Sequence, residues 1–138
     1  MVFRKTLLLL AILTISLIAD LENRYPTLQF IKSGVKIIDI RTESEWLQTG
    51  ILPGSYPITF FDERGNYNVS DFLSKLNRVV EDGEEFALIC RTGHRSSIVS
   101  KFLSKNGYDV INLVGGINYA IHKLGIKTTK YQIGRRYY

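Results

Sequence analysis

Short apolar runs alternate with amphipathic segments from residue 25 onward. Strands are predicted at residues 35–40, 56–60, 86–90 and 110–114, where the runs are brief, apolar and mostly β-branched. Helices are predicted at residues 25–34, 42–50, 70–80, 96–106 and 117–124, where apolar residues recur at helical spacing. Thr42 and Glu45 are expected to form a capping box at the start of the second helix, Gly50 to end it, and Gly115-Gly116 to turn into the last helix. This order predicts an α/β fold with a mainly parallel central sheet flanked by helices on both faces.

Three chemically distinctive positions follow predicted strands. Asp39, Cys90 and Gly115 each stand at or just after the carboxyl end of one. Binding sites of open α/β sheets lie outside these ends, so the pattern places Cys90 in the expected site.

The first twenty residues differ from the rest of the chain. Arg4 and Lys5 precede a mostly apolar run over residues 7–18, and Ala19 follows it. This layout is typical of a secretory signal peptide over residues 1–19. The run is shorter than the ~20 apolar residues of a membrane-spanning helix. We therefore expect an exported, periplasmic protein; the alternatives are an uncleaved anchor in the inner membrane and a buried helix.

Composition narrows the picture further. The chain has 138 residues, which suits one domain, and its net charge of +5 is too modest to indicate nucleic-acid binding. Its single cysteine excludes an internal disulfide. No His/Cys cluster has metal-ligand spacing, so neither a metal nor an organic cofactor is expected.

The single cysteine, Cys90, begins the stretch CRTGHRS. Gly93 permits a tight turn whose amide N–H groups point inward and attract an anion. The start of the next helix and the charges of Arg91 and Arg95 act in the same direction. All these contributions favour thiolate over thiol and predict a nucleophile at Cys90. The competing interpretation is a buried core thiol.

This stretch resembles the active-site loop of the rhodanese-like sulfurtransferase family. Two further segments, IIDIRTESEWLQTGILPGS and YDVINLVGGINYA, resemble the family's earlier and later motifs, so the resemblance covers residues 25–124. It implies that Cys90 carries a persulfide and that residues Arg91, Thr92, Gly93, His94, Arg95 and Ser96 form the loop that binds it. Two departures are Ile51, where the family usually has histidine, and Tyr119, where it usually has tryptophan.

The resemblance implies a reaction that moves sulfane sulfur from thiosulfate or polysulfide to a thiol or to cyanide. The alternative is a sulfur carrier that passes its persulfide to an accepting protein without turnover. Phosphatase or arsenate-reductase chemistry is disfavoured, because related phosphatases have five residues between cysteine and arginine and this chain has four between Cys90 and Arg95.

The remaining candidates have simpler interpretations. Asp39 and Arg41 resemble the family's Asp-x-Arg pair and are expected to hold neighbouring loops in place. His94 is expected at the rim of the site rather than as a general base. Residues 125–138 form a basic, aromatic tail, which is either a surface for lipid or protein or a tail loosely packed on the domain.

Overall fold

The computed structural model describes residues 21–138. The predicted signal peptide, residues 1–19, lies outside this range. Within the described residues, no helix combines the length and the apolar character needed to cross a bilayer.

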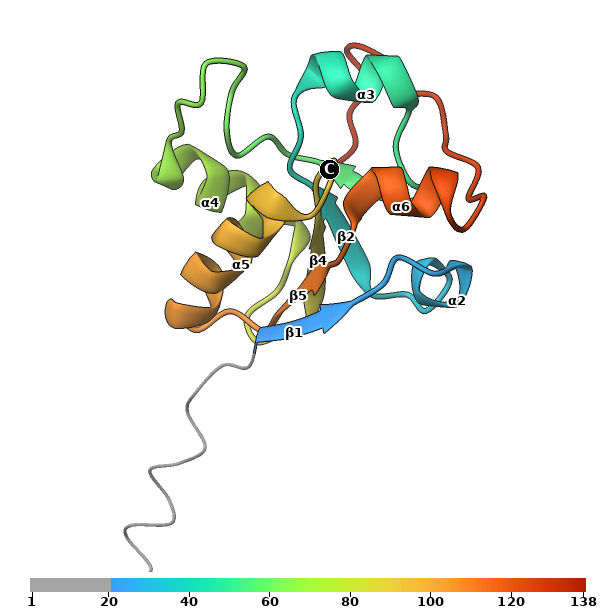
Figure 1. Ribbon diagram of the computed structural model, residues 1–138. Helices are drawn as coiled ribbons and strands as arrows, with labels where there is room; N and C mark the ends of the chain where they lie inside the picture. The colour runs from blue at the N-terminus through green and yellow to red at the C-terminus, as the bar shows by residue number, and fades with distance from the viewer. Residues whose placement is uncertain (1–20) are drawn as a thin grey trace, which may run out of the picture.

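A five-stranded parallel sheet forms the centre of the protein (Figure 1). Its order is β1 (Leu21–Arg24), β5 (Val110–Leu113), β4 (Phe86–Ile89), β2 (Lys36–Asp39) and β3 (Tyr56–Pro57). Every strand pair runs parallel. The predicted α/β class is therefore confirmed. Strand β1 was not predicted, because its sequence LENR has neither an apolar run nor a clean alternation.

Helices cover both faces of the sheet. Helices α4 (Val69–Val79) and α5 (His94–Lys105) cover one face, and α2 (Leu28–Ile31) and α6 (Gly116–His122) cover the other (Figure 1). Alternation along β4 divides its side chains: Phe86 and Leu88 enter the core under α4 and α5, and Ala87 and Ile89 enter the opposite core. Continuing this period-two pattern sends the Cys90 side chain to the α4 and α5 side.

Helix α3 (Glu43–Thr49) lies over the carboxyl end of the sheet (Figure 1). Thr42 caps it, and the reciprocal contacts between Thr42 and Glu45 complete the predicted capping box. Its C-cap is Gly50, as the sequence indicated. Helix α5 begins at His94, two residues before its predicted start.

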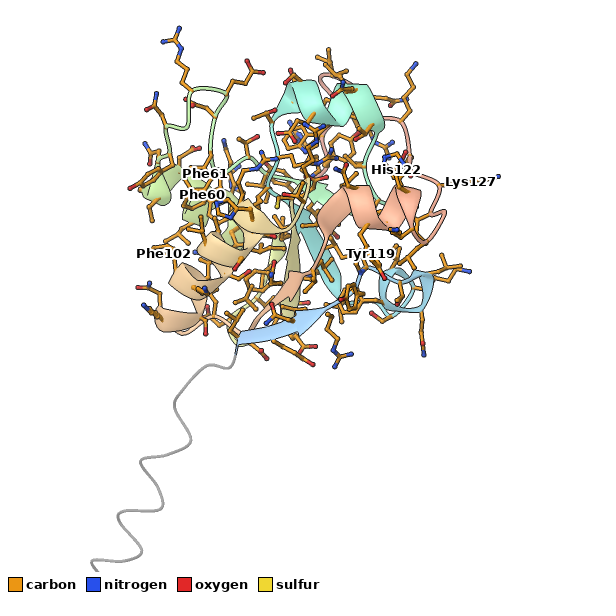
Figure 2. The ribbon with its side chains drawn as sticks, in the orientation of Figure 1. Phe60, Phe61, Phe102, Tyr119, His122 and Lys127 are labelled. Carbon is orange, nitrogen blue, oxygen red and sulfur yellow. The ribbon has the colours of Figure 1, made fainter. Side chains whose placement is uncertain are left out.

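Aromatic side chains reinforce both layers. Figure 2 shows Phe60 and Phe61 on the α4 side and Tyr119 on the α6 side. Phe60 contacts Phe61 and Phe72 edge-on, at centroid distances of 4.8 and 4.9 Å. Tyr119 packs against Tyr25 at 4.8 Å and so joins α6 to the segment after β1.

The C-terminal tail is not loosely packed. Thr129 forms an antiparallel bridge with Ile51, and its neighbour Thr128 donates a hydrogen bond to the Thr49 carbonyl. Tyr131 is 8% exposed and packs with Trp46 and Ile51 in a small core of its own. The tail therefore fixes the outer side of α3.

Candidate active site

Cys90 directly follows strand β4, at the carboxyl end of the sheet where the site was expected. The residue is 1% exposed and borders the core beneath α4 and α5. Burial alone would fit an inert core thiol. The polar groups around its sulfur separate the two interpretations.

Two backbone amides donate to the Cys90 sulfur. The Gly93 N–H lies 3.1 Å from Sγ and the Ser96 N–H lies 3.4 Å from it. Ser96 is the third residue of α5, so the sulfur accepts one of the amides that a helix start leaves unpaired. The N-cap, Gly93, has no side chain, and Cys90 Sγ takes the place of a capping oxygen. An anionic sulfur at this position also gains from the helix dipole.

The Ser96 hydroxyl completes the polar surroundings of the sulfur. It donates to the Gly93 carbonyl at 3.2 Å and lies 3.3 Å from Cys90 Sγ, from which it accepts a hydrogen bond. Ser96 is fully buried, so these contacts are shielded from water. Three of the four hydrogen bonds that hold the loop therefore involve the Cys90 sulfur.

Two glycines permit the close packing behind the loop. Gly93 has φ +96°, and an added Cβ would lie 3.0 Å from the Gly115 nitrogen. Gly116 has φ +60°, and an added Cβ would lie 2.6 Å from the Arg91 carbonyl oxygen and closer still to that of Cys90. The start of α6 therefore contacts the loop backbone, and its Ile117 N–H donates to the Cys90 carbonyl at 2.9 Å.

Arg95 points to α3 rather than to the sulfur. Its guanidinium donates two hydrogen bonds to the Glu45 carboxylate, at 2.7 and 2.8 Å. Burial alone would raise the pKa of Glu45, but the hydrogen bonds and charge of Arg95 outweigh it and bring that pKa below its ordinary value. The same hydrogen bonds raise the pKa of Arg95. Glu45 therefore offsets part of the positive charge that Arg95 brings near the thiol.

Asp39 and Arg41 form a fully buried ion pair behind the site. Both Asp39 carboxylate oxygens accept from Arg41, and one of them also accepts from the Trp46 indole N–H at 3.0 Å. Arg41 donates further to Thr49 and to the Gly50 carbonyl. The pair therefore joins the end of β2 to the middle and the C-terminal end of α3.

The other loop residues face solvent. Arg91, Thr92 and His94 are exposed, and within the described residues their side chains have no hydrogen-bond or ion-pair partner. The Arg91 carbonyl is fixed by the Asn118 N–H at 3.0 Å. The structure thus places the charge of Arg91 at the solvent-exposed rim of the loop.

Sequence reasoning missed two parts of this site. Glu45 was assigned only to the capping box, although it also binds Arg95. Gly116 was read as part of a turn, although the packing of α6 on the loop depends on it. The double glycine after strand β5 was the available signal, because glycine also allows two backbones to approach closely.

The sequence pattern of the rhodanese-like domain matches residues 26–121. The chain therefore belongs to the rhodanese-like domain family. Within residues 21–138, no group of three or more His, Cys, Asp or Glu side chains is placed to hold a metal ion.

Two curated relatives share part of this domain. An "Uncharacterized protein RP600" from Rickettsia prowazekii is 36% identical over 75 residues, which span 52% of this chain and 59% of that protein. A Bacillus subtilis protein named "Putative sulfurtransferase YtwF" is 31% identical over 81 residues, which span 59% of this chain and 68% of that protein.

Solved structures agree with the family assignment. The rhodanese-like domain protein of Staphylococcus aureus is 25% identical with a TM-score of 0.51, covering 73% of this chain and 88% of that one. The SSP1007 protein of Staphylococcus saprophyticus is 28% identical with a TM-score of 0.50, covering 70% of this chain and 83% of that one. The predicted family and fold are thus both confirmed.

Proposed function

We propose that this protein is a sulfurtransferase that moves sulfane sulfur through a persulfide on Cys90. The observation that carries the proposal is the pair of amide N–H groups, from Gly93 and Ser96, that donate to the Cys90 sulfur. A hydrophobic core cysteine needs no such donors, whereas a thiolate is stabilised by them. The relative named as a putative sulfurtransferase supports the same chemistry.

The reaction has two balanced steps. In the first, the Cys90 thiolate attacks the outer sulfur of thiosulfate, a sulfur–sulfur bond forms on the enzyme, and sulfite leaves with the electron pair of the broken bond. In the second, a thiophilic acceptor such as cyanide takes the outer sulfur as thiocyanate and restores the thiolate. Arg91 at the rim attracts the anionic donor. We also propose export to the periplasm. The support for export is the signal-like sequence of residues 1–19.

A thiosulfate–cyanide assay tests the proposal. Wild type is expected to form thiocyanate, and Cys90→Ser is expected to lose that activity while keeping the fold, because serine has nearly the same size. Since the chain has one cysteine, a mass increase of ~32 Da after thiosulfate treatment reports a persulfide at residue 90. Equal thiocyanate formation by both proteins would reject the proposal.

The depth of Cys90 favours a second candidate, a sulfur carrier. Because the thiol is 1% exposed, small donors and acceptors have little room to approach it, and turnover with them would be slow. Intact mass separates the two functions. A carrier keeps the added sulfur in the presence of excess cyanide and releases it to a specific protein thiol, whereas an enzyme loses it to cyanide at once.

A further inference from the structure

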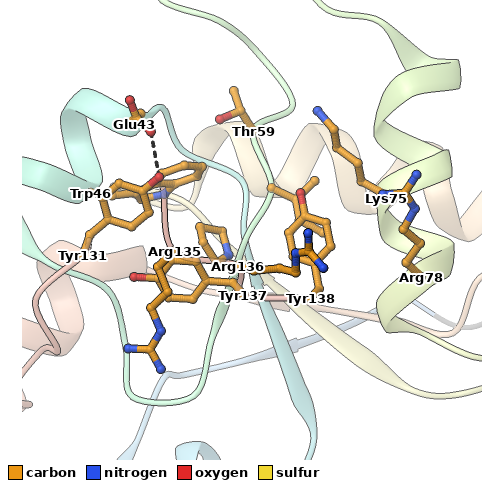
Figure 3. A pocket seen from close by; sticks show the side chains of 12 residues that line it. Glu43, Trp46, Thr59, Lys75, Arg78, Tyr131, Arg135, Arg136, Tyr137 and Tyr138 are labelled. Carbon is orange, nitrogen blue, oxygen red and sulfur yellow. Dashed lines mark hydrogen bonds between the residues drawn. The ribbon is translucent and has the colours of Figure 1, made fainter. Parts of the chain in front are cut away.

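A cavity lies at the β3 edge of the sheet, and no residue of the Cys90 loop lines it (Figure 3). Its volume is about 600 Å³, which is within the ~300–1,000 Å³ of small-molecule sites. Four basic side chains line it, two from α4 and two from the tail: Lys75, Arg78, Arg135 and Arg136. We call this cavity the basic pocket.

The charges around the basic pocket are poorly balanced. Within the described residues, Arg78, Arg135 and Arg136 have no carboxylate within 4 Å, whereas Lys75 is paired with Asp71 at 2.9 Å. Among the lining side chains, Glu43 has the one carboxylate, and it accepts a hydrogen bond from the Tyr131 hydroxyl. These like charges repel each other and produce a positive electrostatic potential inside the basic pocket.

The tail holds its two arginines by specific contacts. Tyr131 packs against Trp46 with tilted rings at a centroid distance of 5.1 Å, and it stacks on Tyr137 at 5.5 Å with the two rings 9° from parallel. The Arg135 guanidinium lies 5.2 Å from the centre of the Tyr137 ring. The chain turns back between these tyrosines, where the Gln132 N–H donates to the Tyr137 hydroxyl at 3.0 Å. The tail therefore supplies its two arginines to one side of the basic pocket, and α4 supplies Lys75 and Arg78 to the other (Figure 3).

We propose that the basic pocket binds a small anion with at least two negative charges, of the phosphate or sulfonate class. Buried Trp46, Ile58 and Tyr131 lie at its floor, and exposed arginines lie at its rim. Guanidinium groups match the oxygens of such anions with paired hydrogen bonds. This site is independent of the proposed sulfur transfer and uses none of the residues of the Cys90 loop.

Isothermal titration calorimetry with the full-length protein tests the site, with inorganic tripolyphosphate and naphthalene-1,5-disulfonate as probes at physiological salt. We expect one-site binding of at least one probe, and about tenfold weaker binding in R78Q/R136Q, which removes one charge from each wall. The matched control is K101Q/K105Q, which removes two exposed charges from α5, outside the pocket. Circular dichroism confirms that each variant is folded.

Three results would overturn the proposal. The first is the absence of saturable binding of both probes to wild type. The second is equal weakening in K101Q/K105Q, which would mean that net charge alone attracts the probe. The third is a loss of binding in R91Q with none in R78Q/R136Q, which would place the anion at the Cys90 loop instead.

Discussion

Gly116 is the position where a single methyl group should disturb the active loop most. In Gly116→Ala the added Cβ would lie 2.6 Å from the Arg91 carbonyl oxygen and closer to that of Cys90. Neither carbonyl can move freely, because each accepts a hydrogen bond from the start of α6, at 2.9 and 3.0 Å. The loop and α6 must therefore separate.

The cost follows from two contributions. A left-handed backbone at φ +60° costs an alanine ~1 kcal/mol. Weakening two hydrogen bonds to the loop carbonyls adds roughly 1 kcal/mol each. We expect Gly116→Ala to lower the free energy of unfolding by about 3 kcal/mol, and to slow persulfide formation because the amide of Gly93 moves with the loop.

Gly125→Ala is the matched control. Gly125 has nearly the same φ, +65°, but a Cβ there would meet nothing within 4 Å. Its expected cost is the ~1 kcal/mol of backbone strain alone. Urea unfolding measures both variants, and intact mass after thiosulfate measures persulfide formation. If the two variants unfold with the same free energy, the contact between α6 and the loop does not have the role assigned to it.

Three further substitutions test the contacts around α3. Asp39→Asn leaves the buried charge of Arg41 without its partner and should cost about 3–5 kcal/mol in urea unfolding; a loss below 1 kcal/mol would contradict this. Burial and the hydrogen bond to Glu43 raise the pKa of Tyr131 to about 12, so wild-type stability should fall as the pH rises from 10 to 12, and Tyr131→Phe should remove that component of the fall. The pKa of Glu45 is lowered, so the ionised carboxylate stabilises the fold above the ordinary pKa of 4.5, and this stability is lost as the pH falls through the pKa of the folded state. Glu45→Gln should lack this acid-dependent loss of stability. Identical pH profiles of unfolding for the variant and wild type would contradict the prediction.

Much of the fold was predictable because its signals are local. A few neighbouring residues are enough to predict the strand β4 from its apolar run, and the start and end of α3 from the capping box at Thr42 and from Gly50. Strand β1 was not predictable in this way. Its polar sequence becomes a strand only because β5, nearly ninety positions later, offers a free edge.

The site shows the same division. Cys90 and the turn at Gly93 could be predicted, because the stretch that contains them is continuous in the sequence. The partner of Arg95 could not, because Glu45 lies fifty residues away and was already explained by its role in the helix cap. The packing of the tail was equally hidden, since it depends on Trp46 and Ile51 meeting Tyr131 across a long separation.

The depth of Cys90 has a consequence for the order in which the two sulfur atoms of the proposed persulfide would react. The transferred atom would bond to Sγ about 2 Å farther out, while Sγ itself stays 1% exposed. An acceptor that reaches the site would therefore meet the outer atom first and remove it, leaving the cysteine intact. Attack on the inner atom would expel hydrosulfide and join the acceptor to the protein, and the burial of Sγ would hinder that reaction.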